Sequence, residues 1–157
     1  MAKRFAVSAA GLLASVLIVA LAASLGGLFG PGDWYRSLAK PDWNPPNWVF
    51  GPVWSFLYLS MAVAGWLVWM RRGERPVGVP LALHGAQLLL NAVWTPLFFG
   101  LHWMGLAFAE ILVLEVFIIA CVAAFWPVSR WAAALMAPYA VWVAFAAFLN
   151  FTLWRLN

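Results

Sequence analysis

Apolar residues follow one another along this chain in five long runs, which only short polar or proline-containing segments interrupt. Runs of about 20 apolar residues are long enough to cross a bilayer as helices. Because hydrocarbon offers the backbone no hydrogen-bond partner, helices rather than open strands fit these runs. The pattern therefore predicts an all-α bundle of five transmembrane helices at about 5–28, 48–70, 79–99, 103–126 and 131–154. A loop rich in tryptophan and proline, residues 29–47, joins the first two helices.

The composition supports an integral membrane protein. Hydrophobic residues make up 66% of the 157 residues, charged residues only 9%, and the mean hydropathy is +0.92. This length predicts one domain, residues 1–157. The start of the first run also fits a signal peptide, because Lys3 and Arg4 precede an apolar segment that ends in small residues near Ala22. Apolar character continues to Phe29, so we expect a retained span.

Positive charges are divided unequally between the two sides of the predicted bundle. If the spans alternate in direction, one side carries Lys3, Arg4, Arg71, Arg72, Arg75 and Arg130, and the other carries Arg36, Lys40 and Arg155. Cytoplasmic loops are enriched in Lys and Arg, so the N-terminus is predicted to be cytoplasmic and the Trp/Pro-rich loop to lie on the opposite side. This bias and attraction to anionic membrane lipid account for the net charge of +4, and no pattern indicates nucleic-acid binding.

Most of the twelve tryptophans are expected at the membrane interfaces, where indole rings anchor helices. Trp54, Trp94 and Trp142 do not fit this expectation, because they lie a turn or more inside the predicted spans. These three residues are candidates for a role beyond anchoring.

Polar side chains share one face of the third span. His84, Gln87, Asn91 and Trp94 recur at steps of three or four residues, which places them on one side of a helix. Polar groups at membrane depth usually face the bundle interior or a cavity. Either they line a cavity, or they form hydrogen bonds between helices that are each worth about 0.6–2 kcal/mol. Both interpretations stay open.

Two further helical faces carry aromatic and small side chains. Tyr139, Trp142 and Ala146 share a face of the fifth span, and Trp54 and Tyr58 are one turn apart in the second. If these faces converge with the polar face of the third span, they enclose a pocket with aromatic walls and a few amide and hydroxyl groups. Such a pocket is typical of sites for flat, mostly apolar molecules.

Few groups could support acid–base or metal chemistry. Glu110 and Glu115 lie inside the fourth span but point about 140° apart on an ideal helix, so they do not form a catalytic pair. A functional and a structural role both fit them. His84, His102 and Cys121 form no recognisable metal motif or disulfide, and axial ligation of a haem iron by one histidine stays open. No metal and no required cofactor are predicted.

Small residues four positions apart allow helices to approach closely, within one chain or between copies. The spacing occurs at Ala6, Ala10 and Ala14, at Gly11 and Ser15, and at Ala140 and Ala144. It is compatible with a homodimer.

Three blocks of the chain together resemble the TspO/translocator protein family, the tryptophan-rich sensory proteins whose animal members were called peripheral benzodiazepine receptors. The first block is Trp34-Tyr35, Lys40-Pro41, Trp43-Asn44-Pro45-Pro46 and Trp48-Val49-Phe50. The second is Gln87, Asn91 and Trp94-Thr95-Pro96-Leu97-Phe98-Phe99-Gly100. The third is Pro138-Tyr139, Trp142, Ala146, Leu149-Asn150 and Trp154-Arg155. The resemblance covers nearly the full length.

The resemblance implies a five-helix membrane receptor, often homodimeric, that binds porphyrins such as protoporphyrin IX and haem, isoquinoline and benzodiazepine-type drugs, and sterols. By motif position its pocket, beneath the first loop, would be lined by Trp34, Trp43, Trp54, Asn91, Trp142 and Ala146, with Tyr58 and Gln87 as neighbours. Arg36 and Lys40 are candidates for binding the propionates of a porphyrin. Phe151 stands where the family's sterol motif has tyrosine, which puts sterol binding in doubt.

Three functions compete. The first is a receptor or carrier, in tetrapyrrole or stress regulation or transport, in which a flat ligand stacks on tryptophan beneath the loop. The second is an enzyme that degrades bound porphyrin in light and oxygen, with Trp54 and Trp142 as its catalytic residues. The third is a scaffold whose aromatic residues only anchor and pack, and which has no saturable ligand.

Overall fold

The computed structural model of the chain describes residues 2–157, with side chains from Ser8 onward. The predicted roles of Lys3, Arg4 and Ala6 lie outside the described side chains. The described residues contain helices and no strand. In chain order the elements are α1 (Ala2–Gly27), α2 (Asp33–Ser37), α3 (Asn47–Met70), α4 (Gly78–Thr95), the π-helical turn η1 (Pro96–Gly100), α5 (Met104–Phe125) and α6 (Arg130–Leu156).

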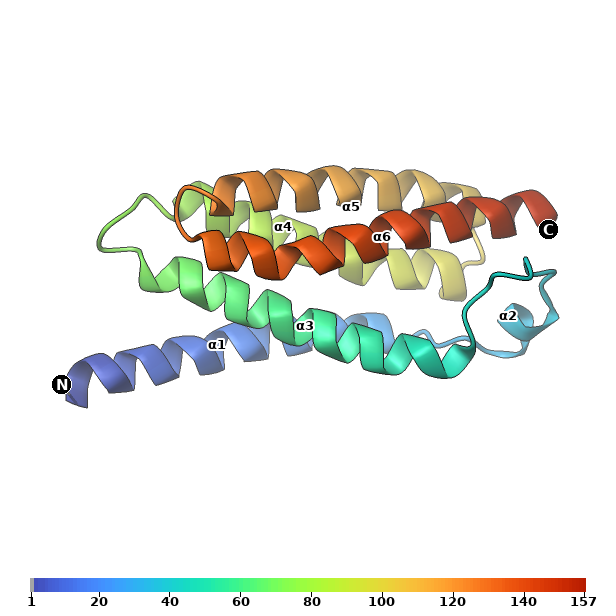
Figure 1. Cartoon of the computed structure of the whole chain (residues 1–157). Helices are drawn as coiled ribbons and strands as arrows, with labels where there is room; N and C mark the ends of the chain where they lie inside the picture. Colours follow the sequence, from blue (N-terminus) through green and yellow to red (C-terminus); the bar gives the residue numbers. More distant parts are fainter. Residues whose placement is uncertain (1) are drawn as a thin grey trace.

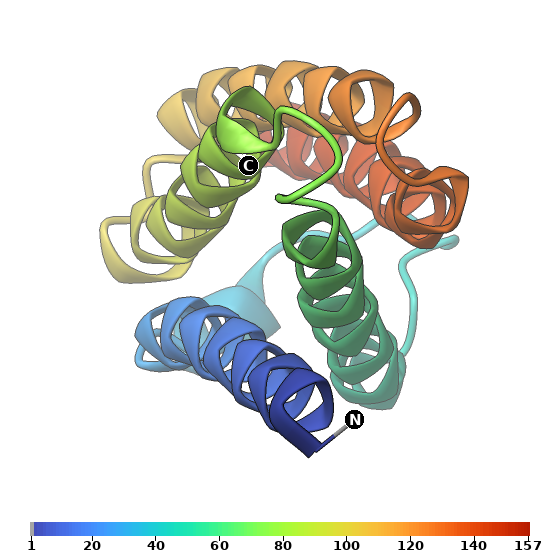
Figure 2. The same ribbon diagram turned by 90° about the vertical axis from the view of Figure 1, so that its left-hand side faces the viewer.

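The long helices pack side by side in one bundle (Figure 1). α5 makes its largest contacts with α6 and α4, whereas α1 packs on α3 and α4 (Figure 2). The main core takes buried side chains from all of them. Val19, Met61, Leu88, Ile118 and Val143 are examples from α1, α3, α4, α5 and α6.

Four helices are long and apolar enough to cross a membrane, judged by length and composition: α1 from Ser8, α3, α5 and α6. α4 is not among them, because its 18 residues include His84, Gln87 and Asn91, which lower the hydropathy of the segment. All three polar side chains are nevertheless buried inside the bundle. The polar face of α4 therefore points inward and its apolar face points outward.

A wide turn ends α4. In η1 the backbone N–H of Leu101 donates to the Pro96 carbonyl at 2.8 Å, which is the five-residue step of a π-helix. Pro96 has no backbone N–H, so the regular α-helical ladder is interrupted at this point. Phe98 and Phe99, although adjacent in sequence, both face the interior of the bundle.

The α1–α3 connection, residues 28–46, lies at the end of the bundle that also holds the C-terminus (Figure 1). It contains α2, whose Trp34 ring stacks on His102 with ring centroids 3.9 Å apart. Further along, the Asn157 side chain accepts a hydrogen bond from the Ala39 N–H at 2.9 Å and donates one to the Ala39 carbonyl at 3.0 Å. The connection is thus fixed to the α4–α5 turn and to the end of α6.

The small residues of α1 serve packing within the chain. A Cβ on Gly11 would collide with the ring of Trp69. Ser15 Oγ donates to the Ala62 carbonyl at 2.6 Å. The Gly11 and Ser15 pair therefore provides the close contact between α1 and α3 of the same chain.

Candidate ligand-binding cavity

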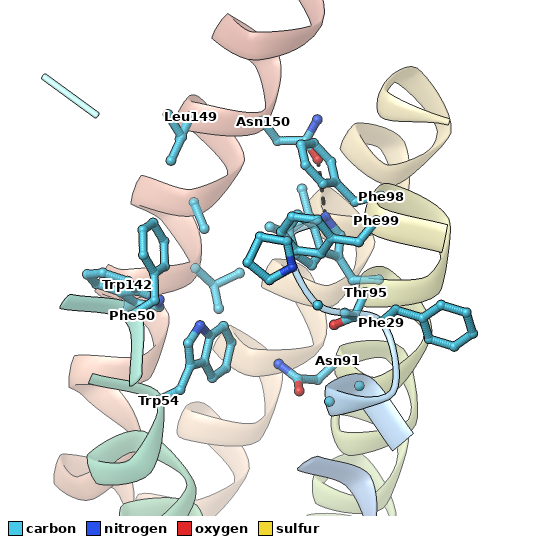
Figure 3. A pocket seen from close by; sticks show the side chains of 18 of the residues that line it. Phe29, Phe50, Trp54, Asn91, Thr95, Phe98, Phe99, Trp142, Leu149 and Asn150 are labelled. Atoms are coloured by element: carbon cyan, nitrogen blue, oxygen red, sulfur yellow. Dashed lines mark hydrogen bonds between the residues drawn. The ribbon is translucent and has the colours of Figure 1, made fainter. Parts of the chain in front are cut away.

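A cavity of about 420 Å³ lies inside the bundle next to the α1–α3 connection (Figure 3). Its walls come from α1, α3, α4, η1, α5 and α6 and from the connection. The volume falls in the range of pockets that hold drug-sized molecules. Most of the lining is apolar, and the aromatic members are Phe29, Tyr35, Phe50, Trp54, Tyr58, Trp94, Phe98, Phe99 and Trp142.

A chain of hydrogen bonds forms the floor of the cavity. The Tyr58 hydroxyl donates to Asn91 Oδ1 at 2.9 Å, and Asn91 Nδ2 donates to the Tyr139 hydroxyl at 3.0 Å. Tyr58 and Asn91 line the cavity, whereas Tyr139 is fully buried behind them. An amide carries two N–H donors, so the bond to Tyr139 uses one of the two donors of Asn91. The floor therefore offers a fixed polar anchor in apolar surroundings.

Trp54 and Trp142 form the wall on the side of α3 and α6 (Figure 3). The Trp54 ring lies 5.2 Å from the ring of Tyr58 and 6.3 Å from that of Tyr139, measured between centroids. The Trp142 ring meets Phe50 edge on at 5.9 Å. These contacts hold two large apolar rings at the edge of the cavity.

Trp94 and Asn150 line the cavity where α4 and α6 face each other. Trp94 Nε1 donates to Asn150 Oδ1 at 3.1 Å, and Asn150 Nδ2 donates to the Met104 carbonyl at 2.9 Å (Figure 3). The Trp94 ring also stacks on Phe98, with centroids 5.0 Å apart. One buried amide thus links α4, α5 and α6 and fixes the orientation of an aromatic wall residue.

The cavity brings together five of the residues that the sequence singled out as a ligand site. They come from α3, α4 and α6, the helices whose aromatic and polar faces were expected to converge. The five are Trp54, Tyr58, Asn91, Trp142 and Ala146.

Trp34 and Trp43 do not line this cavity. Trp34 stacks on His102 instead, and Trp43 stacks on Phe148 with centroids 5.1 Å apart and is 42% exposed. Both tryptophans belong to the α1–α3 connection, whose course depends on contacts with other parts of the chain and not on a helical period. They hold the connection in place on the outside of the cavity.

Gln87 does not line the cavity either, because it lies one turn beneath Asn91, fully buried against His84 and Met61. Its Nε2 is 3.3 Å from His84 Nδ1 and 3.8 Å from Met61 Sδ. Gln87 Oε1 and His84 Nε2 are buried without a hydrogen-bond partner among the described residues. Asn91 thus combines the two predicted roles, because it lines the cavity and also forms hydrogen bonds to α3 and α6, whereas Gln87 and His84 lie in the packed interior.

Neither histidine lines the cavity, because His84 lies beneath the floor and His102 stacks on Trp34. Glu110 and Glu115 also lie outside the cavity lining. Within the described residues, both Glu110 oxygens and Glu115 Oε2 are buried without a hydrogen-bond partner. Among the same residues, no group of three His, Cys, Asp or Glu side chains could hold a metal ion, and Cys121 is buried as a free thiol.

The cations of the α1–α3 connection lie outside the cavity. Arg36 pairs with Asp33 at 3.1 Å on the exposed surface. Lys40 Nζ donates to two backbone carbonyls and lies 4.8 Å from the ring centroid of Tyr35. Tyr35 does line the cavity, and burial raises the pKa of its phenol, against a smaller opposite effect of its hydrogen bond to Asn44.

Several cavity residues were not predicted. Phe98 and Phe99 had one indication in the sequence, Pro96, which lies two residues before Phe98 and directly follows the end of α4. Phe50 lies at the start of α3, and its role depends on the position of Trp142 across the bundle. The lining residues between Ala23 and Pro31, at the end of α1 and the start of the connection, follow no period that would have predicted them.

A bundle of apolar helices around an aromatic-walled internal cavity defines the class of this protein as a helical membrane protein. A model of the TspO/MBR family matches residues 14–155, and the chain belongs to this family. It is 45% identical over 127 residues to the translocator protein of Homo sapiens, covering 79% of this chain and 75% of that protein. It is 42% identical over 135 residues to the tryptophan-rich sensory protein of Cereibacter sphaeroides, covering 86% of this chain and 84% of that protein.

Relatives extend to the archaea. The tryptophan-rich protein TspO of Archaeoglobus fulgidus is 34% identical over 149 residues, which covers 93% of this chain and 96% of that protein.

Proposed function

We propose that this protein is a membrane receptor or carrier that binds a porphyrin, such as protoporphyrin IX or haem, or another flat apolar molecule in the cavity. The observation that supports this proposal best is the lining itself. Trp54, Trp94 and Trp142 contribute large rings to a space of about 420 Å³, while polar groups at Tyr58 and Asn91 gather at one end. Isoquinoline and benzodiazepine-type drugs have the same flat shape, and sterols are a further candidate class.

Stacking on indole rings supplies much of the binding energy in this proposal, since aromatic pairs contribute about 0.5–1.5 kcal/mol beyond the area that they bury. The free amide N–H of Asn91 bonds a polar atom at the inner edge of the ligand. Lys40 and Arg36 already have partners, so we place porphyrin carboxylates at the solvent-exposed rim of the cavity and not on these cations.

We further propose that α4 is the fifth membrane span. Its polar side chains point into the bundle, where intramembrane polar groups are tolerated. The bias of Lys and Arg then places the N-terminus in the cytoplasm and the α1–α3 connection on the opposite side. In this arrangement the whole chain is one domain that assembles as a homodimer in the membrane.

Titration of tryptophan fluorescence with protoporphyrin IX tests the binding site. Trp54→Ala and Trp142→Ala should each weaken binding about tenfold or more, equivalent to about 1.4 kcal/mol. The matched control is Trp131→Ala, because Trp131 is 79% exposed and lies away from the cavity. Unchanged affinity in both cavity variants would count against the site.

Thermal unfolding separates a receptor from a scaffold. A ligand that binds only the native state at 100 times its Kd stabilises that state by about 2.7 kcal/mol. A melting temperature that stays constant as protoporphyrin IX is added would support a scaffold without a ligand.

The alternative function is light-dependent oxidation of bound porphyrin by dioxygen, with Trp54 and Trp142 as one-electron relays. The short ring distances from Trp54 to Tyr58 and Tyr139 favour it, because they extend the aromatic contact beyond the cavity wall. Illumination in oxygen should then yield a new absorbing product. Trp54→Phe and Trp142→Phe should abolish this product while the phenyl rings keep the ligand bound, whereas equal product from the variants would exclude the relay.

A further inference from the structure

Three glycines lie at places where the cavity reaches the surface. Gly27 is the last residue of α1, Gly30 follows it in the connection, and Gly51 lies one turn into α3. Each of them lines the cavity, and each is exposed. The cavity is therefore open between the end of α1 and the start of α3, and these three glycines form its rim.

Neither the backbone nor the packing requires glycine at these positions. No glycine in the described chain has a positive φ, so an L-residue fits the backbone at all three. A Cβ on Gly27, Gly30 or Gly51 would meet no heavy atom within 4 Å. Packing does explain other glycines, such as Gly11, whose Cβ would collide with Trp69.

Glycine at the rim also has a cost. Within a helix it is less stable than alanine by about 0.5–1 kcal/mol, and Gly51 lies inside α3. A side chain at any of the three rim positions would occupy space beside the cavity lining that is open in this structure. Absence of a side chain is thus the property that these positions share, and its effect is to keep the opening wide.

We propose that this glycine rim is the passage through which the ligand enters and leaves the cavity, and that its width selects flat molecules. This proposal rests on the proposed function. The rim lies near Trp48, which is 75% exposed and is typical of the membrane interface, and Asn47 adds an exposed amide to it. The passage therefore fits a molecule with an apolar body and a polar or anionic edge, taken up from the interfacial layer of the bilayer.

An alternative route into the cavity would pass the other side of Trp142, and this route is closed in this structure. An apolar groove between α3 and α6, lined in part by Phe56, Ala137 and Val141, shares Trp142 with the cavity. The Trp142 ring packs against Phe50 and separates the two spaces. Passage there requires the Trp142 ring to move, whereas the three rim glycines have no side chain that would have to move.

Stopped-flow quenching of tryptophan fluorescence by protoporphyrin IX, with the full chain in lipid nanodiscs, tests the passage. Gly27→Leu and Gly51→Leu should narrow the rim and slow both association and dissociation about tenfold or more, as a barrier raised by about 1.4 kcal/mol does. Their Kd, the ratio of the two rates, should change less than about threefold, because a barrier affects both directions equally.

Two matched variants decide between routes. Gly85→Leu fills open space on α4 away from the cavity and should leave both rates unchanged. Ala137→Leu narrows the groove between α3 and α6 and should also leave them unchanged. Normal rates in the rim variants, or slowing by Ala137→Leu alone, would overturn the proposal while saturable binding persists. Absence of saturable binding in the unmodified chain would instead refute the proposed function.

Discussion

Replacing Gly65 by alanine tests how closely α3 and α4 approach each other beneath the cavity floor. A Cβ at this position would lie 2.9 Å from His84 Nε2 and 3.3 Å from Ser15 Oγ. The imidazole has little room to withdraw, because Nδ1 is 3.3 Å from Gln87 Nε2 and the ring packs on Phe125 at 5.6 Å. We therefore expect the Gly65→Ala variant to be overpacked.

Two effects determine how much each alanine substitution changes the free energy of unfolding. Alanine is favoured over glycine in a helix interior by about 0.8–1 kcal/mol. Overpacking of a filled interior costs about 1–3 kcal/mol. Gly85→Ala in α4 gains only the first effect, because its Cβ would meet nothing within 4 Å. The difference in free energy of unfolding between the two variants should therefore equal the packing cost, about 1–3 kcal/mol in favour of Gly85→Ala.

Unfolding of both variants by sodium dodecyl sulfate in detergent micelles measures this difference. In a His84→Ala background only the 3.3 Å contact with Ser15 Oγ remains, so the stability of Gly65→Ala should approach that of Gly85→Ala. The coupling free energy of that double-mutant cycle should be about 1–3 kcal/mol. Equal stabilities of Gly65→Ala and Gly85→Ala in the presence of His84 would refute the close contact.

Other changes test the cavity wall and the α1–α3 connection. Asn150→Leu removes the acceptor of the Trp94 indole N–H and should lower the free energy of unfolding by about 1–2 kcal/mol in the same assay. Asn157→Ala removes two exposed bonds to Ala39 and a partly buried bond to the Leu153 carbonyl, so it should speed amide hydrogen exchange at Ala39 while global stability falls by less than about 1.5 kcal/mol. Because the pKa of Tyr35 is raised in the folded chain, its protonated phenol stabilises the fold below the unfolded value near 10, and this stabilisation is lost as the pH rises above it. Alkaline unfolding followed by tyrosine absorbance should show the loss, and Tyr35→Phe should reduce it.

The helices were predictable because apolar runs end where charged or helix-breaking residues begin. The predicted runs 48–70, 103–126 and 131–154 coincide with α3, α5 and α6 to within two residues. The run 79–99 was predicted as one helix, but the structure divides it into α4 and η1. A sequence period does not show this division, since the wider turn depends on how Phe98 and Phe99 pack.

The candidate site was predictable where it lies on regular helices. A period of 3.6 residues places Trp54 with Tyr58, and Trp142 with Ala146, on single faces, and these faces meet around Asn91. The prediction failed for Trp34 and Trp43 in the connection, because an irregular segment has no helical period from which side-chain directions follow. The cavity-lining glycines at the end of α1 were not predicted either, because a pattern of apolar and polar side chains gives no information about a residue that has no side chain.

The π-helical turn makes the protein sensitive to chain length at one point. Each residue advances an α-helix by about 100°, and η1 takes up one additional residue so that two consecutive rings reach the same side. A single deletion within Pro96–Gly100 would shift the helical phase by about 100° and turn Phe98 or Phe99 away from the cavity. An insertion in the polar turn at 71–77 would leave every helix in phase, so natural variation in length should concentrate there.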